Sequence, residues 1–147
     1  MDAVFYGIDK TQTTCKSIRM IRSSLILLSI LTACFKDETV SSLTENTDVW
    51  VLKTMNEVSI TPIITIRFPE EGRIAGQAPC NRYFGIQAVP LPWFEVKGLG
   101  STKMACLELA MEGRYFDLLQ KMTTAEITGD TLILKSDNGQ TLVYVQN

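Results

Sequence analysis

The chain of 147 residues contains no histidine. Without an imidazole side chain, Ser-His-Asp and Cys-His catalysis, the usual zinc catalytic sites and His-based pH switches are excluded. Basic residues are not in excess, because fourteen Lys and Arg stand against sixteen Asp and Glu, for a net charge of -2. This balance indicates no basic surface for nucleic acid. The chain is 46% hydrophobic and 20% charged, which excludes an intrinsically disordered class.

Long hydrophobic runs are also missing. The apolar stretch at residues 25–31 is far shorter than the roughly 20 residues that a transmembrane helix needs. Lys16, Arg19 and Arg22 precede it, and no acidic residue lies between positions 11 and 35. Basic residues followed by a short apolar core are typical of a secretory signal peptide. We therefore predict that residues 1–33 are such a leader.

The leader ends in Leu31, Thr32, Ala33 and Cys34, which resemble a bacterial lipobox. In a lipobox, small residues such as Ala33 precede a cysteine that is acylated and then becomes the mature N-terminus. We predict cleavage after Ala33, with Leu31 as part of the recognition sequence, and lipidation, including palmitate, at Cys34. The alternative is a short buried strand that ends in a core cysteine.

The start of the leader is open to two interpretations. Met20 begins a compact leader of its own, so residues 1–19 are either an extended n-region or an unused upstream extension. Cys15 is absent from the mature protein in both cases. Phe35, rather than Asp, follows the lipidated cysteine, which favours the periplasmic face of the outer membrane. Residues 34–48 are polar and aperiodic, and we interpret them as a tether.

Short runs rich in β-branched and aromatic residues follow, separated by turn residues, and they predict strands. The predicted strands are 50–54, 63–68, 73–77, 83–89, 93–97, 131–135 and 141–145. Between Leu107 and Met122, apolar residues at helical spacing predict one amphipathic helix of four to five turns, with Glu108 and Glu112 on its polar side. Residues 49–147 are therefore predicted as one α+β domain, mostly antiparallel.

Cys80 and Cys106 are the two cysteines left in the predicted domain. An even number of cysteines in an exported protein favours a disulfide. Closing a loop of about 27 residues stabilises a fold by roughly 3 to 4 kcal/mol in the chain-entropy treatment. The alternative is a pair of buried free thiols.

Two short motifs carry a resemblance to a known family. Residues 76–85 read GQAPCNRYFG and residues 101–106 read STKMAC. They resemble the Gly-x-x-Gly-Cys-Asn-x-Tyr-x-Gly and Ser-Thr-x-Met-x-Cys signatures of the META domain, found in heat-shock lipoproteins of the HslJ type. The matching residues, with one from the following helix, are Gly76, Cys80, Asn81, Tyr83, Gly85, Thr102, Met104, Cys106 and Glu112. Pro79 departs from the pattern, since the family usually has glycine there.

The resemblance implies a single META-type domain with a mostly antiparallel sheet or half-open barrel. It also implies a small, non-enzymatic envelope protein that serves stress tolerance, with a possible protein partner. From the residues themselves we expect Asn81 to bond the neighbouring backbone and Ser101 or Thr102 to cap the helix.

Other chemistries find little support in the sequence. The glycine-rich residues 98–103 lack the spacing of a phosphate loop, so no nucleotide is expected, nor any other cofactor or metal. The rival function is an inhibitor or ligand-binding lipoprotein, of the lysozyme- or protease-inhibitor type. It would use an exposed loop such as Val89 to Gly98, which contains Trp93 and Phe94.

Overall fold

The structure is a computed structural model, and it describes residues 38–147. The leader, its cleavage residues and Cys34 lie outside the described residues, so the signal peptide and the lipid anchor stay predictions. Within residues 38–147, no helix is long and apolar enough to cross a membrane.

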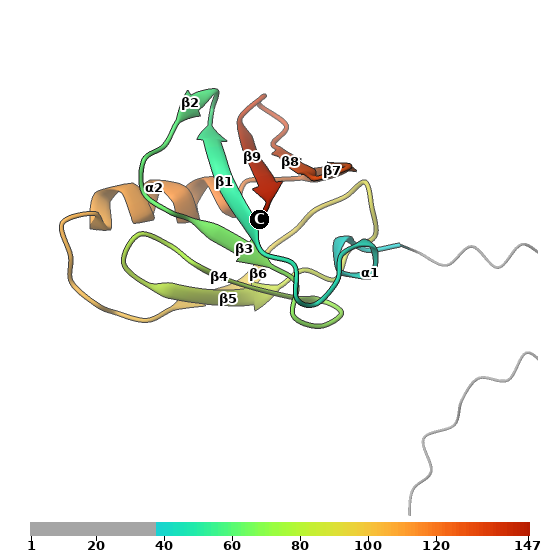
Figure 1. Cartoon of the computed structure of the whole chain (residues 1–147), viewed down its shortest axis with the longest axis horizontal. Coiled ribbons are helices and arrows are strands. Elements are labelled where there is room, and N and C mark those ends of the chain that lie inside the picture. Colours follow the sequence, from blue (N-terminus) through green and yellow to red (C-terminus); the bar gives the residue numbers. More distant parts are fainter. Residues whose placement is uncertain (1–37) are drawn as a thin grey trace, which may run out of the picture. The chain divides into compact units, whose positions relative to one another are not determined.

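Two helices and nine strands make up the described domain (Figure 1). The helices are α1 (Val40–Leu43) and α2 (Leu109–Leu119). The strands are β1 (Trp50–Met55), β2 (Val58–Ser59), β3 (Thr65–Arg67), β4 (Arg73–Gln77), β5 (Arg82–Ile86), β6 (Lys97–Ser101), β7 (Thr124–Thr128), β8 (Thr131–Lys135) and β9 (Thr141–Gln146).

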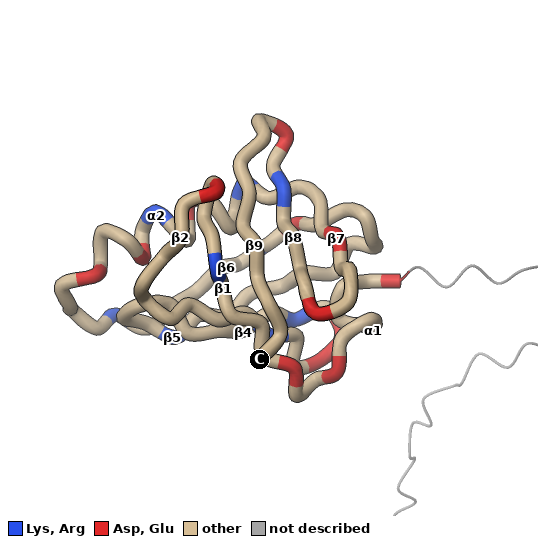
Figure 2. The backbone as a smooth tube through the Cα atoms, turned by 45° about the horizontal axis from the view of Figure 1, so that its top comes forward, with Lys and Arg blue, Asp and Glu red and all other residues tan. Residues whose placement is uncertain are grey.

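All the strand pairs are antiparallel and form one curled sheet in the order β6-β5-β4-β3-β1-β9-β8-β7, with β2 paired to β1. Figure 2 shows β9, β8 and β7 side by side. At the β7 end, Phe94 N–H donates to Thr123 O and Ala125 N–H donates to Pro92 O, both at 2.8 Å. The segment before β6 therefore reaches β7, and the sheet forms a half-barrel. This confirms the predicted α+β fold class.

The inward face of the sheet and one face of α2 form the core. Strand β5 shows the alternation, because Tyr83 and Gly85 are buried while Phe84 is 59% exposed. Side chains at successive strand positions point to opposite faces of a sheet, so only every second residue enters the core. The largest fully buried side chains are Trp50, Tyr83, Tyr115, Tyr144, Phe68, Phe94, Ile64, Ile66, Ile74, Leu119, Leu132 and Leu134.

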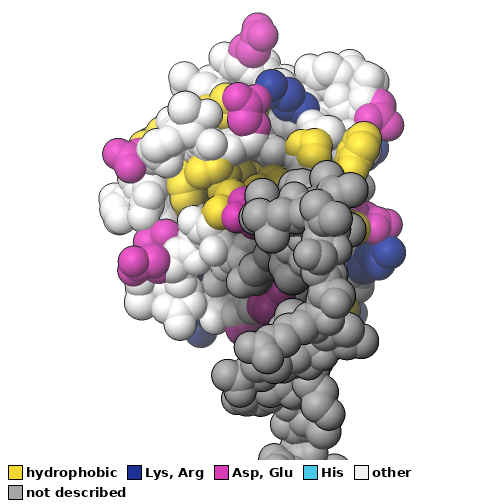
Figure 3. All heavy atoms as spheres, turned by 90° about the vertical axis from the view of Figure 1, so that its right-hand side faces the viewer, with side chains coloured by type: hydrophobic (Ala, Val, Ile, Leu, Met, Phe, Trp, Pro, Cys, Tyr) yellow, Lys and Arg dark blue, Asp and Glu magenta, His cyan; other side chains and the backbone are white. Residues whose placement is uncertain are grey.

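The prediction that residues 34–48 form a tether is wrong for the part that contains helix α1. Val40 is fully buried in the core, and Gly72 N–H donates to Ser41 Oγ at 3.3 Å. Leu91 N–H donates to Glu38 O at 2.7 Å. The folded domain therefore begins well before residue 49, since burying Val40 offsets the entropy lost by ordering this segment. Figure 3 shows the side on which α1 lies, where hydrophobic side chains gather among acidic ones.

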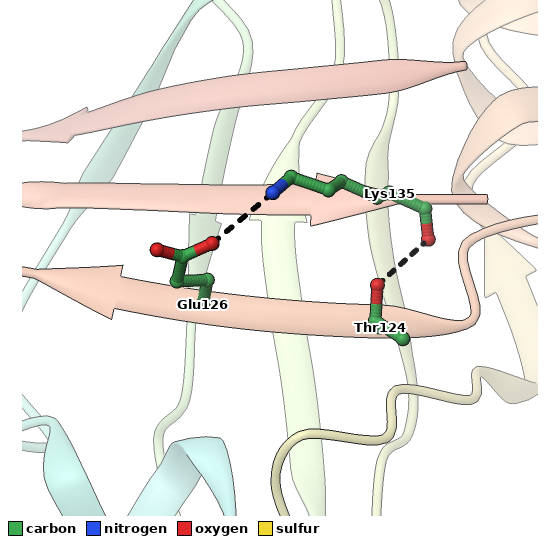
Figure 4. Close-up of polar contacts among 3 residues, drawn as sticks. All are labelled: Thr124, Glu126 and Lys135. Carbon is green, nitrogen blue, oxygen red and sulfur yellow. Dashed lines mark hydrogen bonds and ion pairs between the residues drawn. The ribbon is translucent and has the colours of Figure 1, made fainter. Parts of the chain in front are cut away.

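Strand β7 lies at one end of the sheet and was not predicted. Its sequence, TAEIT, has few of the large apolar residues that mark a strand. Pairing with β8 holds it, and two side-chain contacts add to this pairing (Figure 4). Lys135 Nζ lies 3.1 Å from Glu126 Oε2, and Thr124 Oγ1 donates to Lys135 O at 3.5 Å. Both charged side chains are exposed, so the ion pair contributes at most about 1 kcal/mol.

Two other predicted elements are misplaced. The strand predicted at 93–97 is wrong, because β6 begins at Lys97 and Trp93 makes only an isolated bridge to Thr124. The predicted helix is too long, because α2 begins at Leu109 and Leu107 is 99% exposed. Residues 102–106 instead have no regular secondary structure and lead to the disulfide at Cys106.

Candidate functional site

Glu112 lies at the centre of the signature residues. Its side chain is only 4% exposed, although the helical pattern placed it on the solvent side. The Glu112 carboxylate accepts from Cys80 N–H at 3.0 Å and from Asn81 N–H at 2.8 Å. It also accepts from Asn81 Nδ2 at 2.6 Å. These three donors satisfy a carboxylate that burial would otherwise destabilise strongly, so the expectation of a solvated Glu112 is wrong.

Asn81 extends the contacts to the second signature. Its Oδ1 accepts from Thr102 Oγ1 and from Met104 N–H, both at 2.7 Å, and its Nδ2 donates to Met104 O at 3.3 Å. We call the side chains of Asn81, Thr102 and Glu112, with the backbone of Cys80 and Met104, the Asn81–Glu112 network. It joins the turn before strand β5, the segment after β6 and helix α2.

Two local expectations for these residues are therefore corrected. The Asn81 side chain bonds residues 21 to 31 positions away rather than its neighbouring backbone. Thr102 bonds Asn81 and Arg82 rather than capping the helix, whose N-cap is Glu108, without a side-chain cap bond. Since Asn81 is 2% exposed, its amide has no water to bond and takes the buried partners that tertiary folding brings to it.

A disulfide joins Cys80 to Cys106 beside this network, with a Cα–Cα distance of 6.0 Å. The structure therefore has the disulfide rather than the pair of free thiols. Pro79 leaves the turn intact, because Ala78 N–H still donates to Asn81 O at 2.8 Å. Together, the disulfide and the network fix residues 102–106 against strand β5.

Three buried tyrosines form a second polar group, which we call the tyrosine ladder. Tyr83 donates to Thr65 O at 2.8 Å, its hydroxyl lies 2.7 Å from that of Tyr115, and the Tyr115 hydroxyl lies 3.2 Å from that of Tyr144. Because the carbonyl can only accept, the donors run from Tyr144 through Tyr115 to Tyr83. Burial raises the pKa of all three phenols well above the ordinary value, chiefly by desolvating the phenolate form.

Gly76 makes room for the ladder. A Cβ atom at this position would lie 2.6 Å from the Tyr83 ring and closer still to Thr65 O. Gly85 is crowded to a lesser degree, with Lys97 O and a Val96 methyl 3.3 Å from an added Cβ. Both signature glycines are thus needed for close packing rather than for an unusual backbone conformation.

Comparison with known proteins identifies the family to which these residues belong. The sequence model of the META domain matches residues 41–147. The chain belongs to the META domain family. No curated protein matches it.

Two solved structures share the META fold of this chain. One, described as the NMR structure of the protein from Burkholderia xenovorans, is 22% identical with a TM-score of 0.60, and the match covers 88% of this chain and 99% of the other. The second, described as an NMR structure of a protein, is 26% identical with a TM-score of 0.55, covering 67% and 87% of the two chains. Neither description states a function.

The META signature residues of this chain bond to one another or pack in the same region. Eight of the nine predicted signature residues lie in or beside the Asn81–Glu112 network, the disulfide and the tyrosine ladder, and the ninth, Gly85, packs against Val96 and Lys97. The META family is not a known enzyme family. Within residues 38–147, no group of three or more Cys, Asp or Glu side chains could hold a metal ion. Through hydrogen bonds and one disulfide, this arrangement connects the turn before β5, residues 102–106 and α2.

A hollow of about 450 Å³ lies elsewhere on the META domain, between the β1–β2 hairpin and helix α2. We call it the hairpin groove. The residues lining it are Met55, Asn56, Val58, Ser59, Ile60, Met111, Arg114, Asp117, Leu118, Lys121 and Gln140. Sequence reasoning missed this groove, because its two walls are some 50 residues apart and no motif connects them.

The loop from Val89 to Gly98, which an inhibitor would use, has one exposed and one buried aromatic side chain. Trp93 is 61% exposed, whereas Phe94 beside it is 2% exposed. Phe94 packs in the core and fixes the base of the loop, while Trp93 faces solvent. Exposed tryptophan is enriched among residues that dominate protein interfaces, so this side chain is available to a partner.

Proposed function

We propose that this protein is a bacterial envelope lipoprotein whose META domain is a non-enzymatic structural or interaction module in envelope stress tolerance. The observation that carries the proposal is the use of the signature polar groups. Glu112 accepts three hydrogen bonds from the first signature, and Asn81 bonds the second, so these groups hold the fold together. Groups bound in this way are not free to exchange protons with a substrate.

The proposed anchor is the lipid on Cys34, on the periplasmic face of the outer membrane. The lipobox-like residues 31–34 after a leader of signal-peptide type support it. Several acyl chains, at roughly 0.8 kcal/mol per buried CH₂, exceed what stable anchoring needs. Because Glu38 is already bonded to the domain, only three residues separate it from Cys34, and a chain of this length spans at most roughly 14 Å. The anchor would thus hold the domain close to the bilayer.

The anchor is tested by cell fractionation. We expect Cys34→Ser to move the protein from the membrane fraction to the soluble fraction and to abolish incorporation of labelled palmitate. Cys15→Ser is the matched control, since that cysteine is discarded with the leader, and it should change neither result. Membrane fractionation of the Cys34→Ser protein at the wild-type level would contradict the proposed lipobox.

The interaction role is tested by crosslinking in intact cells under envelope stress, followed by mass spectrometry. We expect one or a few envelope proteins to crosslink reproducibly to surface residues of the domain. Deletion of the gene should sensitise the cells to the same stress. Unchanged stress tolerance of the deletion strain would contradict the proposed role.

A second candidate is an inhibitor of a lysozyme or protease, and the exposed Trp93 favours it. This candidate requires direct binding to a muramidase or protease, which Trp93→Ala should abolish. Phe84→Ala is the matched control, because Phe84 is exposed to a similar extent, 59%, on strand β5. Equal binding by both variants, or no binding by the wild type, would eliminate this candidate.

A further inference from the structure

The β1–β2 hairpin passes near helix α2 (Figures 1 and 2). The hairpin groove is lined by residues of both. On the helix side, Met111, Arg114, Leu118 and Lys121 are spaced at i, i+3, i+7 and i+10. This spacing puts all four on one stripe of the helix or its end. Helix α2 therefore turns one face to the core, through Glu112 and Tyr115, and another to the groove.

The floor of the groove is apolar. Met55 and Ile60 on the hairpin side are partly buried against the core, and Val58 is 66% exposed. Met111 and Leu118 complete the floor from the helix. A second hollow of about 520 Å³ adjoins it and shares Ser59, Ile60 and Met111 with it. We call the two adjoining hollows together the trough, and Glu108 also lines its second part. Methionine side chains adapt to ligands of irregular shape.

The rim of the groove carries two cations. Arg114 and Lys121 are exposed, and among residues 38–147 neither forms an ion pair. Asp117 lies between them on the helix, so the lining of this hollow carries one net positive charge, whereas Glu108 lines the second hollow. Gln140, also in the lining, has a buried side-chain oxygen without a hydrogen-bond partner in the described part of the chain. Arg114 Nη2 makes one weak contact, to Met111 Sδ at 4.0 Å. Within residues 38–147 the charges of Arg114 and Lys121 are otherwise left to solvent.

We propose that the hairpin groove binds a fatty acid, with its acyl chain in the trough and its carboxylate at Arg114 and Lys121. Small-molecule sites have volumes of about 300 to 1,000 Å³, apolar linings and a few polar groups that orient the ligand. The groove meets each criterion. A carboxylate matches the planar fork of an arginine side chain, and the neighbouring lysine adds a second charge. This inference does not depend on the lipid at Cys34.

Binding is tested by titration of the full chain, kept unacylated by Cys34→Ser, with laurate below its micelle concentration. We expect saturable, one-to-one binding, with affinity rising about three- to fourfold for each CH₂ from decanoate to myristate. NMR shifts should map to the methyl groups of Met55, Ile60 and Met111. Dodecanol, which has the same chain without the charge, should bind about tenfold more weakly.

Two sets of variants locate the ligand. Met111→Glu places a carboxylate in the floor and should weaken laurate binding at least about tenfold. Its matched control is Ile86→Glu, because Ile86 is 45% exposed on strand β5, outside the groove. Arg114→Ala with Lys121→Ala should abolish the preference for laurate over dodecanol, and Lys97→Ala with Lys135→Ala should leave it unchanged.

Several results would overturn the inference. They are the absence of saturable laurate binding, equal affinities of wild type and Met111→Glu, and shifts that map to Phe84 or Trp93. Tighter binding of lysophosphatidylglycerol than of a carboxylate with the same chain would refute the fatty acid as ligand. Since Arg114 and Lys121 are exposed, their double variant should fold. It therefore tests the fatty-acid proposal even if the Met111→Glu protein fails to fold. Failure of the anchor test leaves all these results unaffected.

Discussion

Helix α2 contributes to two regions that differ in whether their polar side chains have partners within the domain. On its core face, Glu112 and Tyr115 enter the Asn81–Glu112 network and the tyrosine ladder, where each polar group described has a partner. On its groove face, Arg114 and Lys121 have no ionic partner within residues 38–147. Residues on the core face therefore stabilise the META domain, whereas the two cations on the groove face add no ion pair within the described residues.

The difference has an energetic basis. A buried donor or acceptor without a partner costs about 1 to 3 kcal/mol, so a fold tolerates few of them in its core. An exposed cation costs little, because water solvates it. Substitutions in the network should therefore change stability, whereas substitutions in the groove should change binding. Four predictions test this contrast, from the largest expected effect to the smallest.

The tyrosine ladder predicts loss of stability at alkaline pH. The pKa of each of the three phenols is raised in the fold, whereas an unfolded tyrosine titrates near pH 10. Above about pH 10 the unfolded chain releases protons that the folded chain retains. The free energy of unfolding should then fall by up to about 4 kcal/mol per pH unit for three tyrosines. Denaturant titrations at increasing pH measure this slope. Phenolate absorbance near pH 10 in a folded domain would contradict it.

Glu112→Ala should destabilise the domain by about 3 to 5 kcal/mol, because Cys80 N–H, Asn81 N–H and Asn81 Nδ2 lose their acceptor. Chemical denaturation measures the change. Glu108→Ala is the matched control from the exposed N-cap of the same helix, where no side-chain cap bond forms, and it should cost under about 1 kcal/mol. Similar losses in both variants would mean that the network does not stabilise the fold.

Gly76→Ala should destabilise the domain by about 2 to 3 kcal/mol, because the added methyl group overlaps the Tyr83 ring and Thr65 O. Gly113→Ala, on the exposed side of α2, meets no atom within 4 Å of its new Cβ. It should instead stabilise the helix by up to about 1 kcal/mol. Thermal unfolding of the two variants should show shifts of opposite sign, and shifts of the same sign would refute the packing argument.

Val58→Ser in the hairpin groove should change the free energy of unfolding by no more than about 0.5 kcal/mol, since Val58 is 66% exposed. The same variant should weaken laurate binding, because it removes part of the apolar floor. Denaturation and titration on one preparation test both statements. A large loss of stability would show that the groove belongs to the core, which would remove the contrast between the two regions.

Much of this fold could be predicted from local patterns. Strands 73–77 and 131–135 are found at their predicted bounds, and the signature residues were identified before their contacts were known. Strand β7 was missed because its TAEIT sequence has a weak local preference, and pairing with β8 decides its conformation. The start of α2 was misplaced because a disulfide and the Asn81 bonds, rather than residue preferences, fix residues 102–106.

The sequence by itself determined the family and the fold class, because these depend on short motifs and on the spacing of apolar residues. It left the state of Cys80 and Cys106 open between a disulfide and free thiols, and the tertiary structure has the disulfide. Only the tertiary structure decided that Glu112 is buried, that Val40 belongs to the core and that a groove lies beside α2. Each of these depends on contacts between segments distant in the chain. A helical pattern shows which residues share a face, but the partners that pack against the helix decide which face is buried.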